Sequence, residues 1–156
     1  MNVLAWSGLV LILDQLTKQV IRNNLELHDS IQVIGKNILI TYVENPGIAF
    51  GINIEGGSLL FMIASLLATA LIFLYLWRWR NGTLLIRISL ALILGGAFGN
   101  LTDRFLYGKV VDFIQVGAAG WYWPIFNVAD SAVTIGMILF LYLSFFRQNK
   151  DAPELA

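Results

Sequence analysis

An apolar run from Ser58 to Trp77 constrains the fold of this chain more than any other feature of its sequence. The run has no charged side chain, and a helix of about 20 residues covers the ~30 Å hydrocarbon core of a bilayer. Overall, 58% of the residues are hydrophobic and 13% are charged, so a domain surrounded by water would lack polar surface. We therefore predict an integral membrane protein, mainly α-helical, whose residues 1–156 form one domain.

Three other apolar segments complete a predicted set of four transmembrane helices, at approximately 3–20, 58–77, 85–103 and 126–146. We expect the first segment to be a retained span and not a signal peptide, because Asp14 and Lys18 interrupt it and no small-x-small site follows it. Four spans place both termini on one side. Basic residues favour the cytoplasm, and they are dense in the turn after the second span and present in the tail: Arg78, Arg80, Arg87, Arg147 and Lys150. Both termini are therefore predicted to be cytoplasmic.

The two longer connections, approximately 23–57 and 105–125, are then extracytoplasmic. Residues 30–34 and 38–43 read as two strands around the turn Gly35-Lys36-Asn37, and residues 109–116 read as a third strand. Trp121-Tyr122-Trp123 has the aromatic character of a membrane interface. We expect a small β-sheet with loops at the extracytoplasmic ends of the helices.

Composition excludes several kinds of site. The chain has no cysteine and one histidine, His28, which lies in a polar loop. A zinc hydrolase usually needs two or more His or Cys ligands, and a catalytic triad needs a well-placed histidine. The net charge is zero and no basic run is present, which argues against nucleic acid as a partner. No metal and no cofactor are predicted.

Charged side chains within or at the ends of the spans are candidates for a functional site. Asp14, Asp103, Arg104 and Asp130 lie there, although a charge at the centre of a membrane helix costs ~2.5–3.5 kcal/mol. We therefore expect them to face a polar interior and to pair. Gly96, Asn100 and Arg104 recur every four residues and share a helix face.

Purely structural interpretations remain open for several of these residues. Asp14 and Lys18, four apart, predict an intrahelical ion pair that needs no further role. Gly95 and Gly96 favour close helix packing, and Asn127 has the character of a helix N-cap. Asp130 has no basic neighbour within four residues. Asp112 interrupts an apolar strand, so neither aspartate is explained so simply.

Five sequence blocks together resemble lipoprotein signal peptidase, also called signal peptidase II, a bacterial aspartic protease of the inner membrane. They are, in order, Asp14-Gln15-Leu16-Thr17-Lys18, Asn45-Pro46-Gly47-Ile48-Ala49-Phe50-Gly51, Gly95-Gly96-Ala97-Phe98-Gly99-Asn100-Leu101-Thr102-Asp103-Arg104, Val110-Val111-Asp112-Phe113 and Phe126-Asn127-Val128-Ala129-Asp130. The resemblance covers nearly the whole chain.

The resemblance implies a metal-independent aspartic endopeptidase with Asp112 and Asp130 as its catalytic pair. Supporting or substrate-binding positions fall on Asp14, Asn45, Gly96, Asn100, Arg104 and Asn127, and structural polar positions on Lys18 and Asp103. The implied substrates are prolipoproteins, cut just before a cysteine that carries diacylglycerol. Membrane lipids are the other expected partners, and the protein is expected to be a monomer.

Two carboxylates held close together share a proton, so one can activate water while the other polarises the scissile carbonyl. We expect Asn127 to orient Asp130 or to hold the substrate backbone, Asn45 to do the same from the opposite wall, and Arg104 to pair with Asp103 or Asp14. The active site is expected near the extracytoplasmic surface. The alternative is a small proton-coupled transporter or assembly factor using Asp14 and Asp130, in which Asp112 has no role.

Overall fold

Four helices and four short strands make up the computed structural model, which describes residues 3–47 and 57–146. In chain order the elements are α1 (Leu4–Asn24), β1 (Ser30–Ile34), β2 (Ile38–Asn45), α2 (Gly57–Arg78), α3 (Leu84–Tyr107), β3 (Val110–Ala118), β4 (Trp121–Tyr122) and α4 (Val128–Phe146). Each predicted span coincides with most of one of these helices. Helices α1 and α3 continue about one turn beyond the predicted ends of their spans, to Asn24 and Tyr107.

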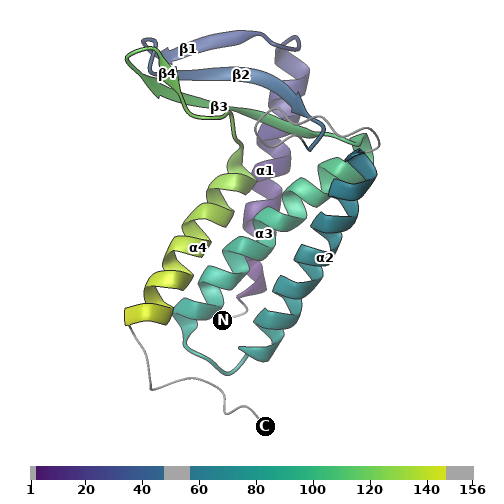
Figure 1. Ribbon diagram of the computed structural model, residues 1–156, viewed down its shortest axis with the longest axis vertical. Coiled ribbons are helices and arrows are strands. Elements are labelled where there is room, and N and C mark those ends of the chain that lie inside the picture. The colour runs from purple at the N-terminus through teal and green to yellow at the C-terminus, as the bar shows by residue number, and fades with distance from the viewer. Residues whose placement is uncertain (1–2, 48–56, 147–156) are drawn as a thin grey trace.

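The helices lie side by side, and the sheet covers one end of the bundle (Figure 1). Helix α3 is central and packs against α1, α2 and α4. The start of α1, the turn between α2 and α3 and the end of α4 lie at the opposite end (Figure 1). Chain segments that the sequence assigned to one side of a membrane are therefore together in space.

Glycines allow the close approach of α3 to its neighbours. A Cβ on Gly95 would lie 2.8 Å from the Ser7 carbonyl oxygen of α1, and a Cβ on Gly96 would collide with the Ala129 carbonyl oxygen of α4. A Cβ on Gly136 of α4 would lie 2.7 Å from the Ser89 carbonyl oxygen of α3. The small-residue faces are therefore helix-packing faces, as one of the two interpretations of Gly95 and Gly96 required.

The sheet is antiparallel with strand order β1-β2-β3-β4. Both strands predicted for residues 30–43 are confirmed, and the third is confirmed with a longer C-terminal end. Strand β2 pairs with β3 so that Val43 lies opposite Asp112 and Asn45 opposite Val110. Ile21 of α1 packs with Tyr42, Val111 and Phe113 of the sheet. This cluster fixes the start of β3 above α1.

Among the residues that the structure describes, three helices are long and apolar enough to cross a membrane: Leu59–Arg78 within α2, together with α3 and α4. Helix α1 is not among them, because its polar residues make it less apolar than the other three helices. Asp14 and Lys18 are fully buried inside the bundle, whereas Leu13, Leu16 and Val20 on the outer side of α1 are exposed. The exposed side of α1 is therefore apolar despite the charges within the helix.

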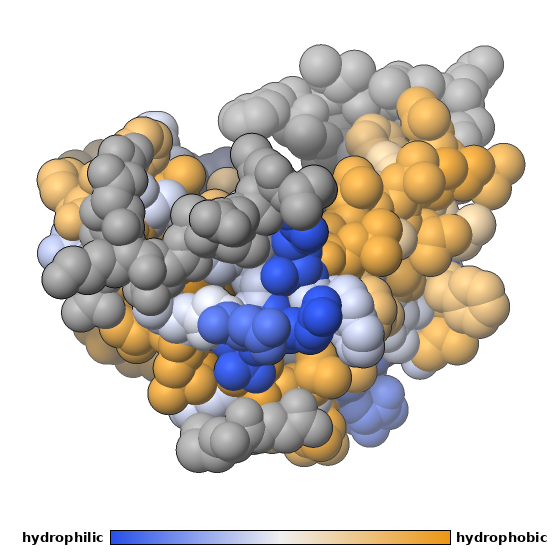
Figure 2. All heavy atoms as spheres, turned by 90° about the horizontal axis from the view of Figure 1, so that it is seen from below, coloured by the Kyte–Doolittle hydropathy of each residue, from blue (hydrophilic) through white to orange (hydrophobic). Residues whose placement is uncertain are grey.

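The end of the bundle away from the sheet has a different character. Figure 2 views the molecule from this end and shows a hydrophilic cluster bordered by hydrophobic atoms. The turn between α2 and α3 lies here, with Arg78, Arg80 and Arg87 in or beside it. Arg147 and Lys150, which also entered the orientation argument, lie outside the described residues.

Candidate active site

Asp112 is the third residue of β3 and is 4% exposed. Both carboxylate oxygens accept hydrogen bonds from amide side chains. Asn127 donates to Oδ1 at 2.7 Å, and Asn45, at the end of β2, donates to Oδ2 at 3.1 Å. The antiparallel pairing of β2 with β3 sets this second contact, because it brings the end of β2 beside the start of β3.

Asp130 is half-buried in the first turn of α4 and takes part in a reciprocal cap. The Asn127 side-chain oxygen accepts the backbone N–H of Asp130 at 2.8 Å, and the Asp130 Oδ2 accepts the backbone N–H of Asn127 at 3.2 Å. This is a capping box with Asn at the N-cap and Asp at the third helical position. The other oxygen, Oδ1, accepts a hydrogen bond from Asn100 of α3 at 2.7 Å.

Asn127 joins the surroundings of the two aspartates. Its side-chain nitrogen donates to Asp112, to the Asn100 oxygen at 3.1 Å and to the Val111 carbonyl at 3.2 Å. Its side-chain oxygen is engaged by the helix cap. The predicted cap, which holds Asp130, and a contact with Asp112 that the sequence did not predict are therefore made by the same side chain, and its amide cannot flip without losing both.

A second cluster of buried charges lies deeper between α1 and α3. Lys18 forms ion pairs with Asp14 at 2.8 Å and with Asp103 at 3.1 Å, and all three side chains are fully buried. The predicted Asp14–Lys18 pair is confirmed. Asp103 also accepts the backbone N–H of Val111 at 3.1 Å, so this cluster supports the strand that carries Asp112.

The two clusters are connected at two points. Lys18 Nζ donates to the Asn100 oxygen at 3.0 Å, while the Asn100 nitrogen donates to Asp130. Asp14 accepts the backbone N–H of Ala129 at 2.9 Å, at the second position of α4. A carboxylate is favoured at a helix N-terminus, where backbone N–H groups are unpaired. Helix α1 thereby fixes the start of α4, and with it Asp130.

Burial and the neighbouring charge of Asp130 raise the pKa of Asp112 from its ordinary 3.8 to about 6. The hydrogen bonds from Asn45 and Asn127 act in the opposite direction, because they stabilise the ionised carboxylate. Asp112 therefore holds its proton to a higher pH than an exposed aspartate. A carboxyl group poised in this way suits acid–base chemistry.

The interpretation of Arg104 needs a correction. We expected it to pair with Asp103 or Asp14, but Asp103 pairs with Lys18 and Arg22. Within the described part of the chain, Arg104 forms no ion pair, and its side chain makes only a 3.5 Å contact with the Asn100 carbonyl oxygen. Its Nε is buried and has no hydrogen-bond partner among residues 3–47 and 57–146. The partner of Asp103 is decided by the packing of α1 against α3, which spacing along α3 does not reveal.

Gly96 contributes no polar side chain to the site. Its role is in packing, because the Ala129 carbonyl oxygen of α4 lies against its backbone. Sequence reasoning missed two contributors from α1. Arg22 pairs with Asp103 at 3.1 Å, and Gln15 donates to Asp14, Asp103 and the Gly99 carbonyl. The four-residue spacing of Asp14, Lys18 and Arg22 was a usable signal for Arg22.

The acidic side chains of the site are arranged around asparagines. Across residues 3–47 and 57–146, no group of three or more His, Cys, Asp or Glu side chains is placed to hold a metal ion. Two carboxyl groups on different elements, one buried and one half-buried, are instead held by a shared set of asparagines. Residues 48–51 of the second sequence block lie outside the described residues.

The chain is similar to known proteins along most of its length. The family model described as signal peptidase (SPase) II matches residues 6–146. A lipoprotein signal peptidase of Syntrophus aciditrophicus (strain SB) is 43% identical over 150 residues, covering 93% of this chain and 92% of that protein. The lipoprotein signal peptidase of Listeria monocytogenes serotype 4a (strain HCC23) is 40% identical over 141 residues, covering 90% of this chain and 91% of that protein.

A solved structure of a bacterial membrane enzyme superposes with a TM-score of 0.79 at 33% identity, covering 95% of this chain and 94% of that one. The fold, the order of the sequence blocks and the relatives therefore agree. The chain belongs to the signal peptidase II family and is a membrane-embedded protease.

Proposed function

We propose that this protein is an aspartic endopeptidase that removes signal peptides from diacylglyceryl-modified prolipoproteins, with Asp112 and Asp130 as its catalytic pair. The observation that carries the proposal is that both carboxyl groups accept hydrogen bonds from Asn127, Asp112 from its side chain and Asp130 from its backbone N–H. The substrate class comes from the relatives, which are lipoprotein signal peptidases. Nothing in the fold or in the comparisons favours the transporter alternative.

The surroundings of the two aspartates suggest different roles for them. Asp112 is buried, and its raised pKa makes it the partner that carries the proton. Asp130 is half-buried and accepts hydrogen bonds from Asn100 and from the Asn127 backbone. In this proposal Asp130 takes a proton from the attacking water. Asp112 polarises the scissile carbonyl and then protonates the leaving amine.

No metal ion or covalent intermediate takes part in the proposed reaction. Water is the nucleophile, and the proton that it loses is carried by the aspartate pair to the leaving nitrogen. Hydrolysis that continues undiminished in the presence of a strong chelator such as EDTA is the expected result. A loss of turnover that added Zn²⁺ or Mg²⁺ restores would refute metal independence.

Arg104 is proposed to bind the substrate backbone. Its charge interacts with Asp130 and Asp112 at longer range, and its Nε has no acceptor among the described residues. A peptide carbonyl would supply that acceptor in a site from which water is largely excluded. Substitution R104A should then give normally abundant protein with a raised KM. Poor yield of an otherwise active enzyme would return Arg104 to a structural role.

The membrane topology follows from the same considerations. All four helices are proposed to span the bacterial inner membrane, α1 included, because its charges are buried against α3 and its outer side is apolar. Both termini are cytoplasmic in this proposal. The sheet and the two aspartates then lie near the extracytoplasmic surface, where the scissile bond of a lipid-anchored substrate is expected.

The proposal is tested with purified protein and a lipidated signal-peptide substrate, beside the same peptide without the lipid. Cleavage before the lipidated cysteine only is the expected result. D112N and D130N should each reduce turnover by about 10³-fold or more while leaving membrane insertion intact. D29N, at an exposed loop aspartate, is the matched control and should keep full activity. Substantial turnover by either active-site variant would refute the two-aspartate mechanism.

A further inference from the structure

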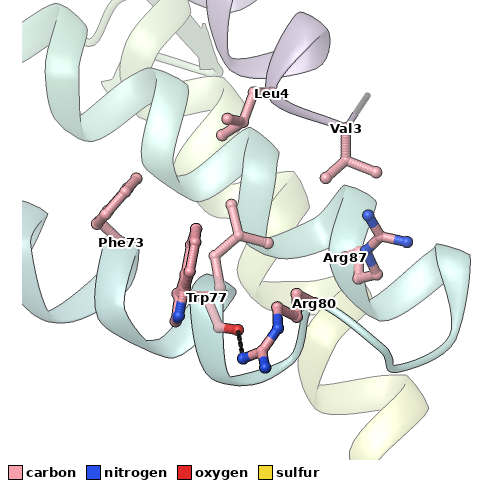
Figure 3. Close-up of a pocket in the computed structure, with 7 residues that line it drawn as sticks. Val3, Leu4, Phe73, Trp77, Arg80 and Arg87 are labelled. Atoms are coloured by element: carbon pink, nitrogen blue, oxygen red, sulfur yellow. Dashed lines mark hydrogen bonds between the residues drawn. The ribbon is translucent and has the colours of Figure 1, made fainter. Parts of the chain in front are cut away.

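A pocket at the end of the bundle opposite the sheet has no part in the proposed reaction. It encloses about 170 Å³ between the start of α1, the end of α2 and the start of α3. Figure 3 shows how its side chains converge from these three helices. The lining residues are Val3, Leu4, Phe73, Leu76, Trp77, Arg80 and Arg87.

Two arginines give the pocket a positive mouth. Within the described part of the chain, neither Arg80 nor Arg87 forms an ion pair. The Arg80 guanidinium lies over the Trp77 ring, 5.5 Å from its centroid, and donates to the Trp77 carbonyl oxygen at 3.5 Å (Figure 3). Arg87 Nε is buried and has no hydrogen-bond acceptor there. A buried donor without an acceptor is costly, so an anionic ligand would be stabilising.

The rest of the pocket is apolar. Phe73 lies one helical turn, ~5.4 Å, deeper along α2 than Trp77, and Leu76 and Val3 are buried in the core beside it. The polar groups are therefore at the mouth and the hydrocarbon groups are within. An occupant that satisfies both parts has an anionic head and an apolar tail.

We propose that this pocket binds one anionic phospholipid, with its phosphate between Arg80 and Arg87 and an acyl chain along Leu76 and Phe73. Basic pockets between transmembrane helices are suited to acidic lipid headgroups, because the positive charge and the adjoining hydrocarbon are both complemented. A bound lipid would also connect the start of α1 to α2 and α3. The proposal does not depend on the catalytic assignment, since the pocket is at the other end of the bundle from Asp112 and Asp130.

The test is native mass spectrometry of the purified full-length chain in detergent, titrated with phosphatidylglycerol and, separately, with phosphatidylcholine of the same acyl chains. One retained phosphatidylglycerol is expected, bound about tenfold or more tightly than phosphatidylcholine. R80Q/R87Q should remove that preference. R80Q alone changes an exposed turn residue, which folding should tolerate, and should weaken binding about fivefold.

R78Q is the matched control, because Arg78 is exposed at the end of α2 and does not line the pocket. It should bind phosphatidylglycerol like the unmodified chain. Equal binding of the two lipids, or equal losses in R78Q and R80Q, would overturn the proposal. Displacement of the lipid by millimolar inorganic phosphate alone would overturn it as well, since the apolar part of the pocket would then contribute nothing.

Discussion

Replacing Asp112 with asparagine should remove activity, and the stability of the variant relative to the unmodified chain should increase as the pH rises. Burial and the charge of Asp130 raise the pKa of Asp112 from 3.8 to about 6. The folded protein therefore binds this proton more tightly than the unfolded chain does. The stability contributed by the protonated group is fully present below pH 3.8, falls as the pH rises, and is lost above about pH 6.

The size of the effect follows from the same two values. Each pH unit corresponds to ~1.36 kcal/mol, so ionised Asp112 lowers the free energy of unfolding by ~3 kcal/mol at pH 8. Asparagine does not ionise and avoids this cost. Its amide nitrogen must face the donor nitrogen of Asn45 or Asn127, since both of these are held by other hydrogen bonds. That mismatch costs about 1–3 kcal/mol and does not depend on pH.

The cost of ionising Asp112 depends on pH and the cost of the amide mismatch does not, so a measurement at two pH values separates them. The free energy of unfolding of D112N and of the unmodified chain should be measured at pH 4 and pH 8, for example by titration with SDS from mild micelles. The difference between them should move by ~2–3 kcal/mol in favour of D112N between the two pH values. A difference that is the same at both pH values would refute the raised pKa and the role derived from it.

Three further substitutions test separate parts of the site. N45A removes a hydrogen bond that lowers the pKa of Asp112, so the fall of kcat/KM at rising pH should move to higher pH; a shift to lower pH would contradict the proton-carrying role. K18A leaves buried Asp14 without its ion pair and leaves Asp103 with Arg22 alone, so it should destabilise the protein by ~3–5 kcal/mol in thermal unfolding; a loss below about 1 kcal/mol would refute the importance of these pairs. G96A should destabilise the protein at the α3–α4 contact. G8A is the control, because its added Cβ meets nothing within 4 Å, and it should raise the free energy of unfolding by up to ~1 kcal/mol. Equal melting temperatures of the two variants would argue against the glycine contact.

The helices and strands were predictable because their signals are local. The charge-free run of α2 indicates a helix surrounded by lipid. The alternation of apolar and polar residues around Gly35-Lys36-Asn37 indicates strands with two different faces. Strand β4 was not predicted, and Trp121 and Tyr122 were interpreted only as interface residues. Two residues carry too little alternation to distinguish these possibilities.

The site was only partly predictable, for a reason that Arg104 and Asp103 illustrate. Helical spacing places them on adjacent faces of α3, but it does not say which helix each face meets. Asp103 meets α1 and takes two cations from it, which leaves Arg104 without an ion pair among the described residues. Asn127 shows the same limit, since the sequence indicated a helix cap or a role beside Asp130, whereas the fold also brings its side chain against Asp112.

The buried charges of α1 also explain how a half-buried aspartate is held at the start of a helix. Asp14 binds the second backbone N–H of α4, and Lys18 binds the asparagine that contacts Asp130. A buried ion pair contributes little net stability, since desolvation offsets most of its attraction. Its contribution here is geometric, because the same three charges fix the start of α4 from one side and the start of β3, through Asp103, from the other. The elements that carry Asp130 and Asp112 are therefore positioned by one cluster, and a change in that cluster should move both aspartates together.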